Sequence, residues 1–285
     1  MITPIMLRSF GRSGSTLLMQ VLGSSKNVIF DRDYPFEKRH LTYFHRLANI
    51  VGKDADNDSD WNPDTIFNSS LNRVGPIPYQ EVEIFDRKKL SDDLLRRLWN
   101  GFSHQVAACQ SESIDDSKPI YYAEKVVHDI CDDINNIVEA KNLFLFRDPR
   151  DEFLSVKSFN KKRGFNGFGW QKDDTDESYA LKLCNMRRNF MRHIANIERD
   201  ERRFLVKYEE FMGNPYEITN SIGEWIGLNL DYGKVESQKK AVAHHFTSSS
   251  VGASVGRWKT EMEQSVAAIF ARELGEELQL LGYEV

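Results

Sequence analysis

Residues 10–18 form a short stretch whose side chains suit the binding of an anion. The stretch reads Phe-Gly-Arg-Ser-Gly-Ser-Thr-Leu-Leu and combines two glycines and three hydroxyls with one arginine. Glycine lets backbone N–H groups approach a ligand closely, while the hydroxyls and the guanidinium add donors and a fixed positive charge. We therefore predict a cradle for a phosphorylated or sulfated group. Its binding residues are Gly11, Arg12, Ser13, Gly14, Ser15 and Thr16.

Two other interpretations of this stretch compete with an anion cradle. It could be an ordinary polar turn in which a serine caps the following helix. It could also be the phosphate loop of a nucleoside-triphosphatase, but that motif requires a lysine directly after its second glycine, whereas Ser15 follows Gly14 here. The sequence therefore lacks the lysine-dependent form of the loop.

The segments on either side of the stretch are expected to aim it at a ligand. Residues 2–7 are mostly apolar, as in a buried strand, and residues 17–22 carry apolar side chains at helical spacing. A strand, a tight loop and a helix in this order point the unpaired N–H groups of the first helical turn at the loop. The positive end of the helix dipole points the same way.

Further strands and helices alternate along the chain. Apolar runs at 28–30, 120–123, 143–146 and 204–208 are separated by amphipathic helical patterns. Such alternation indicates an α/β fold with a central parallel sheet and helices on both faces. A length of 285 residues fits one domain, and we expect a mainly helical insertion within it at about 52–118.

Local signals predict where several elements begin and end. Pro35 is expected near the first turn of a helix, and Ser91-Asp92-Asp93 at the N-cap of the next one. Further helices are expected at about 130–140 and 178–200. The polar, glycine-containing stretch at 161–177 is expected to be a mobile loop of the kind that covers active sites.

Composition excludes several classes of function. A net charge of −5 and a pI near 5.9 argue against a nucleic-acid binder, which needs a basic face. Cys109, Cys131 and Cys184 are widely and irregularly spaced, so neither a metal site nor a disulfide framework is predicted. No charged segment followed by an apolar one resembles a signal peptide, and no apolar run could span a bilayer. We therefore expect a cytoplasmic protein without a membrane partner.

Two motifs together resemble the sulfotransferases, which use 3′-phosphoadenosine-5′-phosphosulfate (PAPS). Arg-Ser-Gly-Ser-Thr at 12–16 is similar to the family loop that binds the 5′-phosphosulfate. Leu-Phe-Leu-Phe-Arg at 143–147, with Ser155 eight residues after Arg147, is similar to the segment that holds the 3′-phosphate. The resemblance implies a P-loop-like sulfotransferase fold in which Arg147 and Ser155 bind the nucleotide.

Three further matches follow in family order. Lys125, in Ala-Glu-Lys, looks like the family lysine that bridges donor and acceptor, although Val126-Val127 replaces the common Thr-Pro. Tyr208 begins a Tyr-Glu-Glu-Phe segment similar to one whose tyrosine lies near the adenine. Gly256-Arg257-Trp258 is similar to a segment that closes over the nucleotide, so the resemblance makes Tyr208, Gly256 and Arg257 nucleotide-binding residues.

The resemblance also implies a catalytic base. Tyrosylprotein sulfotransferases, the branch that this bacterial-type sequence resembles, use a glutamate about 21 residues after the loop arginine. Counting from Arg12 leads to Asp33. A carboxylate favoured by a helix N-terminus is the alternative explanation for Asp33. Glu37 and His128 remain alternative bases.

The implied reaction is transfer of a sulfuryl group from PAPS to a hydroxyl or amine of a small-molecule or saccharide acceptor. Asp33 would take the proton, and Arg12 and Lys125 would stabilise the leaving group without a metal. The product is adenosine 3′,5′-bisphosphate (PAP). A magnesium-dependent nucleotide kinase and a non-catalytic nucleotide-binding protein are the alternatives. The acceptor's identity and the oligomeric state cannot be inferred from the sequence.

Overall fold

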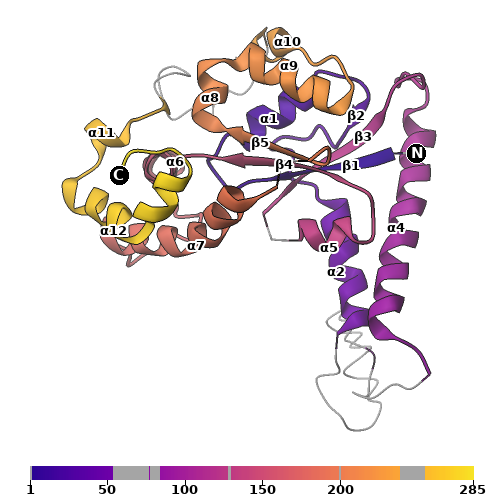
Figure 1. Ribbon diagram of the computed structural model, residues 1–285, viewed down its shortest axis with the longest axis horizontal. Helices are drawn as coiled ribbons and strands as arrows, with labels where there is room; N and C mark the ends of the chain where they lie inside the picture. Colours follow the sequence, from indigo (N-terminus) through magenta and orange to yellow (C-terminus); the bar gives the residue numbers. More distant parts are fainter. Residues whose placement is uncertain (1, 54–76, 78–83, 128–129, 199, 238–253) are drawn as a thin grey trace.

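A computed structural model describes residues 2–53, 77, 84–127, 130–198, 200–237 and 254–285. Within them, five parallel strands form one central sheet in the order β2-β3-β1-β4-β5 (Figure 1). The carboxyl ends of parallel strands meet at one edge, where ligands bind in open α/β sheets. The strands are β1 (Ile2–Arg8), β2 (Val28–Ile29), β3 (Ile120–Val126), β4 (Lys141–Phe146) and β5 (Arg203–Lys207).

Alternate side chains of β1 enter two different apolar cores. Ile5 and Leu7 contribute to the core on one face of the sheet, and Ile2 and Met6 contribute to the core on the other face. This alternation follows from the two-residue period of a strand. The first core includes α1 (Ser15–Leu22), α8 (Tyr208–Gly213), α9 (Pro215–Ile226) and α10 (Tyr232–Ser237), and the second includes α2 (His40–Gly52), α4 (Arg87–Gln110) and α5 (Cys131–Asn135).

A third apolar cluster is formed by helices that follow β4 in the chain. It joins α6 (Pro149–Arg163), α7 (Asp176–Asn196) and α12 (Gln264–Leu280), and Trp258 at the start of α11 (Trp258–Glu261) packs against it. Helices therefore cover both faces, and the predicted α/β architecture with a parallel central sheet is confirmed (Figure 1).

The helix expected near Pro35 begins later. Residues 30–39 are irregular, and α2 starts at His40. Glu124, buried on β3, accepts hydrogen bonds from the backbone N–H groups of Leu41 and Thr42 at 2.8 and 2.9 Å. A carboxylate from a neighbouring strand therefore satisfies the first turn of α2, and this signal cannot be read from the residues next to the helix.

Other boundaries also differ from the predicted ones. α4 begins at Arg87 with Asp86 as its N-cap, and Ser91 lies inside the helix, where its hydroxyl donates to the carbonyl of Ala48. The prediction that residues 91–93 cap this helix is therefore wrong. α5 ends at Asn135, well before residue 140.

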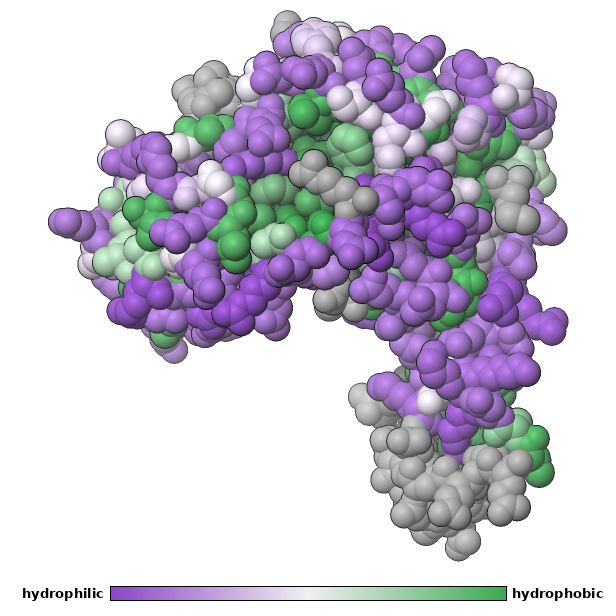
Figure 2. Space-filling model, in the orientation of Figure 1, coloured by the Kyte–Doolittle hydropathy of each residue, from purple (hydrophilic) through white to green (hydrophobic). Residues whose placement is uncertain are grey.

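The α2 and α4 helices lie side by side and extend away from the sheet (Figure 1). Hydrophilic residues cover most of this projection in the view of Figure 2. Of the predicted insertion at 52–118, the described part includes α4, whose buried Leu95 and Trp99 share a core with α2 and β3. Among the helices that the structure describes, none is both long and apolar enough to cross a membrane.

Candidate active site

The loop between β1 and α1 has the geometry of an anion cradle. Gly14 occupies the N-cap position of α1 with φ at 96°, so no side chain at this position caps the first-turn N–H groups. A serine N-cap, which the ordinary-turn interpretation requires, is therefore not what the structure has. Arg12 also has a positive φ of 69°, and the hydroxyl of Ser13 donates to the carbonyl of Phe10 at 2.6 Å. The first-turn amides of α1 thus face the loop.

Arg12 and Arg147 bring the two predicted phosphate-binding motifs together. The Nε of Arg12 donates to the hydroxyl of Ser155 at 3.1 Å, and Nη1 of Arg147 donates to the carbonyl of Arg12 at 2.8 Å. These contacts join segments that are more than a hundred residues apart in sequence. Burial, together with the neighbouring charge of Arg147, lowers the pKa of Arg12 to about 10. Two cations held this closely favour an anion between or beside them.

Arg147 retains an unused donor at this place. The residue is 8% exposed, and its Nε has no hydrogen-bond partner among the described residues. Nη2 donates to the carbonyl of Ser254 at 2.5 Å, and the guanidinium lies 4.4 Å from the centre of the Tyr208 ring. A buried donor without a partner is costly, and a bound anion would satisfy it.

Lys125 reaches the same loop from the end of β3. Its side chain is 4% exposed, and Nζ donates to the hydroxyl of Thr16 at 2.9 Å and to the carbonyl of Pro35 at 2.7 Å. Burial lowers the pKa of Lys125 to about 8. The ammonium is thus held at the first turn of α1. A phosphate bound there would also accept hydrogen bonds from the N–H groups of the loop.

The two described candidates for the base occupy different surroundings. Asp33 is exposed and forms an ion pair with Lys38 at 2.6 Å. Glu37 is half-exposed, and its Oε1 lies 4.0 Å from Nζ of Lys125. The structure therefore places Glu37 beside the lysine and gives no contact between Lys125 and Asp33. The third candidate, His128, lies outside the described residues.

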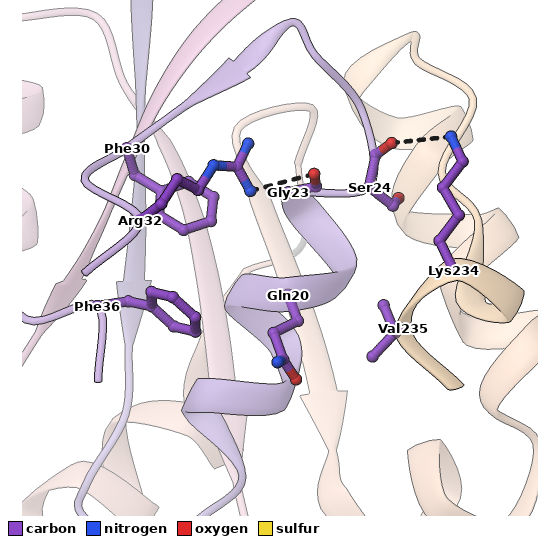
Figure 3. Close-up of a pocket in the computed structure, with 8 residues that line it drawn as sticks. All are labelled: Gln20, Gly23, Ser24, Phe30, Arg32, Phe36, Lys234 and Val235. Atoms are coloured by element: carbon purple, nitrogen blue, oxygen red, sulfur yellow. Dashed lines mark hydrogen bonds between the residues drawn. The ribbon is translucent and has the colours of Figure 1, made fainter. Parts of the chain in front are cut away.

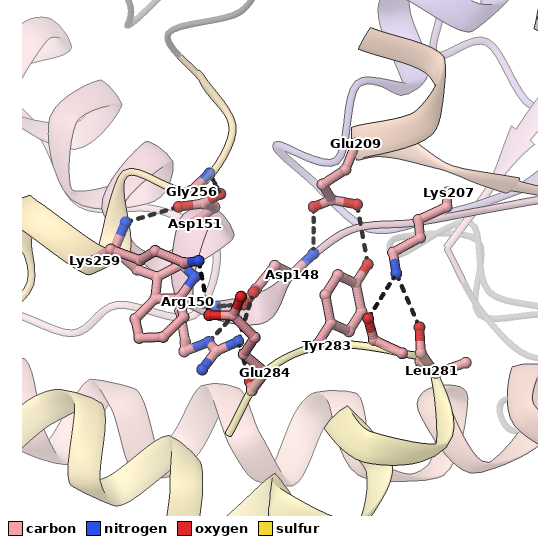
Figure 4. Close-up of polar contacts among 12 residues, drawn as sticks. Asp148, Arg150, Asp151, Lys207, Glu209, Gly256, Lys259, Leu281, Tyr283 and Glu284 are labelled. Atoms are coloured by element: carbon pink, nitrogen blue, oxygen red, sulfur yellow. Dashed lines mark hydrogen bonds and ion pairs between the residues drawn. The ribbon is translucent and has the colours of Figure 1, made fainter. Parts of the chain in front are cut away.

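The predicted nucleotide-binding residues of the C-terminal half lie around α6. A Cβ on Gly14 would lie only 2.6 Å from the ring of Tyr208. The hydroxyl of Tyr208 is 2.8 Å from the hydroxyl of Ser254. Gly256 donates its N–H to Asp151 at 2.6 Å (Figure 4). The guanidinium of Arg257 binds Glu261 at 2.7 Å, and this ion pair directs the side chain to α11.

Three residues near the loop were not predicted from the sequence. Phe168, in the irregular stretch after α6, lies over Gly11, where a Cβ would meet its ring at 2.5 Å. Asp151 fixes the Gly256 segment, and Ser254 contacts both Arg147 and Tyr208. For these three residues, the only signal in the sequence was the group of glycines around Phe168, which predicted an irregular loop. Trp170 stacks on Tyr179 at 4.1 Å and anchors that loop.

The described residues include no group of three or more histidine, cysteine, aspartate or glutamate side chains that could hold a metal ion. The site assembled here is instead cationic. Its functional groups are the buried guanidinium of Arg147, the partly buried guanidinium of Arg12, the buried ammonium of Lys125 and the N-terminal amides of α1. This combination suits a ligand with more than one anionic group.

Solved structures with a similar fold were found. The sulfotransferase domain from the curacin biosynthetic pathway matches with a TM-score of 0.52 over 100% of this chain and 99% of that domain, at 14% identity. The sulfotransferase domain of the Synechococcus PCC 7002 olefin synthase gives 0.48 over 100% and 96%, at 16% identity. A mouse sulfotransferase complexed with PAP gives 0.47 over 97% and 84%, at 13% identity. No family model and no curated protein matches the sequence.

The chain has the sulfotransferase fold. At 14% identity the likeness concerns the arrangement of the elements and not the chemistry of individual residues. The sulfotransferase fold predicted from the two motifs is confirmed, and the roles of the individual site residues remain predictions.

Proposed function

We propose that this protein is a sulfotransferase that moves a sulfuryl group from PAPS to a hydroxyl or amine of a small-molecule or saccharide acceptor. The observation that carries the proposal is the junction of the two anion-binding motifs, in which Arg12 contacts Ser155 and Arg147 contacts Arg12. A ligand with phosphates at both ends of one nucleoside can use both motifs at once. A nucleotide with a single phosphate chain would leave the second motif, Arg147 and Ser155, without an anion to bind.

The residues divide the binding of PAPS between them. Arg12 and the loop around Gly14 would hold the 5′-phosphosulfate, while Arg147 and Ser155 would hold the 3′-phosphate. Tyr208 and the Gly256–Arg257 segment would flank the nucleotide. The buried, unpartnered Nε of Arg147 supports this assignment, because a phosphate oxygen would supply its missing acceptor.

Lys125 and a carboxylate would act on the transferred group. Lys125 lies beside Thr16 and would stabilise the negative charge that develops on the bridging oxygen as the sulfuryl group leaves. The acceptor's proton would pass to a carboxylate acting as general base. Glu37, at 4.0 Å from Lys125, is better placed for this role than Asp33, whose carboxylate binds Lys38.

Calorimetric titration with PAP, compared with ATP and magnesium, tests the nucleotide assignment. PAP should bind to the wild-type protein without magnesium. Arg147→Ala should weaken PAP binding by about 2–4 kcal/mol, since a charge-assisted pair is lost. Arg96→Ala, which removes an exposed arginine of α4, is the matched control and should leave PAP affinity unchanged.

Transfer of radiolabelled sulfate from PAPS to a panel of phenols, alcohols and sugars tests the reaction. Labelled product that requires Lys125 supports a sulfotransferase. Tight PAP binding without product from any acceptor indicates the non-catalytic nucleotide-binding protein. Preference for ATP with magnesium over PAP would contradict the proposal in favour of a kinase.

A further inference from the structure

A pocket of about 320 Å³ lies between α1, the segment that follows β2, and α10 (Figure 3). None of the nucleotide-binding residues assigned above lines it. Its size is within the range of small-molecule sites. Its polar and aromatic lining includes Gln20, Ser24, Phe30, Arg32, Phe36 and Lys234.

The residues that line the pocket include two cations and no carboxylate. Arg32 donates to the carbonyls of Gly23 and Val28 at 3.1 and 3.2 Å, and Lys234 donates to the carbonyl of Ser24 at 3.3 Å. Among the described residues neither cation forms an ion pair, and the lining includes no aspartate or glutamate. Both side chains are exposed, and the carbonyl groups that they contact orient them but leave their charge available to an anion.

Arg32 is held across the end of α1 by close contacts. A Cβ on Gly23 would meet Nη1 of Arg32 at 2.0 Å and the ring of Phe30 at 2.8 Å, so a side chain at this position would displace the arginine. The guanidinium stands 4.1 Å from the centre of the Phe30 ring, and Phe30 meets Phe36 edge to face at 5.5 Å. The pocket therefore combines fixed cations with aromatic surface.

The pocket lies along the same face of α1 as the Lys125 contact. Thr16, which accepts from Lys125, is one turn before Gln20 and two turns before Gly23, so about 10 Å separates the ends of this face. Phe36 links the two places, because its ring lines the pocket and its centre lies 6.0 Å from Nζ of Lys125. An elongated molecule could reach from the cations to the reacting group.

We infer that this pocket binds the acceptor, and that the acceptor is an amphipathic hydroxy acid. Its carboxylate would lie between Arg32 and Lys234, its apolar body against Phe36, and its hydroxyl beside Lys125. This inference rests on the proposed sulfuryl transfer for the fate of the hydroxyl. Binding of the carboxylate does not depend on that transfer.

Calorimetric titration of the PAP complex with 3-(4-hydroxyphenyl)propanoate and its methyl ester tests the pocket without turnover. The acid should bind the wild-type protein roughly tenfold more tightly than the ester. Lys234→Gln should abolish most of that preference while leaving ester affinity unchanged. Arg32→Gln should act in the same way, with its fold checked by circular dichroism. Lys88→Gln, at an exposed lysine of α4, is the matched control and should keep the preference.

Equal binding of acid and ester to the wild-type protein would overturn the inference. So would an equal loss of both affinities in Lys234→Gln, because that result indicates a structural effect. Acid binding that depends on Lys234 supports the pocket even where PAPS gives no sulfated product, a result that contradicts only the proposed function. If acceptors are sulfated equally well by Lys234→Gln and by the wild-type protein, only the assignment of this pocket as the acceptor site is contradicted.

Discussion

Burial of Lys125 ties the predicted activity to pH. Its pKa is lowered to about 8 from an ordinary value of 10.5 because the ammonium is removed from water. The stabilising charge is present below this pKa and is lost above it. We expect kcat/KM to fall about tenfold per pH unit above pH 8. In Lys125→Arg this decrease in kcat/KM should begin at a higher pH, since arginine stays charged.

The same pKa gives a readout that does not require turnover. The folded protein releases the Lys125 proton at a lower pH than the unfolded chain, so the unfolded state binds more protons between about pH 8 and 10.5. The free energy of unfolding should gain a stabilising contribution as pH rises through this window. Lys125→Met should lack that contribution. An identical pH dependence in urea unfolding of both proteins would contradict the assignment.

The surroundings of Glu37 and Asp33 predict opposite results for two conservative substitutions. Glu37→Gln should lower kcat by about 10²-fold or more, because the base next to Lys125 is lost. Asp33→Asn removes only an exposed ion pair with Lys38 and should leave kcat within a few-fold of wild type. Single-turnover transfer of labelled sulfate measures both. A large loss of kcat in Asp33→Asn but not in Glu37→Gln would make Asp33 the base. If neither variant loses kcat, His128 is the remaining candidate.

At the residue scale, the sequence predicted three cations for the candidate site. Arg12, Lys125 and Arg147 do meet at the β1–α1 loop. Motif spacing could suggest this because each residue follows a predicted strand of one parallel sheet, and such strand ends share an edge. Spacing could not separate Asp33 from Glu37, since residues 30–39 are irregular and the direction of each side chain depends on tertiary contacts.

At the scale of elements, the join between β1 and α1 depends on a glycine. Gly14 has φ at 96°, and a Cβ there would stand 2.6 Å from the ring of Tyr208. Gly14→Ala should therefore destabilise the fold by about 1–3 kcal/mol and weaken PAP binding, because the cradle has to move away from Tyr208. Urea unfolding and calorimetry measure the two effects.

Gly101→Ala is the control for that substitution. Gly101 lies within α4, and a Cβ there meets no atom within 4 Å. Alanine should stabilise the helix by about 0.5–1 kcal/mol and leave PAP affinity unchanged. Full PAP affinity in Gly14→Ala would show that the loop conformation is not needed for binding.

Element types were easier to predict than element boundaries. Strong apolar runs identified all five strands of the described sheet, and their alternation with helices gave the parallel topology. The start of α2 was missed because its cap, Glu124, belongs to β3. The start of α4 was missed because Asp86 and Ser91 both suit an N-cap, and tertiary contact with Ala48 places Ser91 inside the helix.

At the scale of the whole molecule, residues 281–284 tie several site-bearing segments together (Figure 4). Lys207, at the end of β5, donates to the carbonyl of Leu281 at 2.9 Å, and Arg150 donates to the carbonyl of Glu284 at 2.7 Å. The Tyr283 hydroxyl donates to Glu209 at 3.0 Å. No sequence pattern predicted these contacts, since they join residues that are distant in the chain.

The Tyr283–Glu209 pair links this segment to the predicted nucleotide site. Glu209 also accepts the N–H of Asp148 at 2.9 Å, and Asp148 directly follows Arg147. Burial raises the pKa of both Glu209 and Tyr283. Removing the tyrosine hydroxyl would leave one oxygen of this partly buried carboxyl group without its partner, which costs about 1–3 kcal/mol.

Tyr283→Phe should therefore lower the midpoint of thermal unfolding by several degrees, given about 2–4 °C per kcal/mol for chains of this size class. It should also weaken PAP binding, because the backbone that carries Arg147 loses part of its support. Tyr43→Phe, at an exposed tyrosine of α2, should change neither quantity. A destabilised Tyr283→Phe protein with unchanged PAP affinity would separate the segment's contribution to stability from any effect on the site. A protein with an unchanged unfolding midpoint would show that water replaces the lost donor.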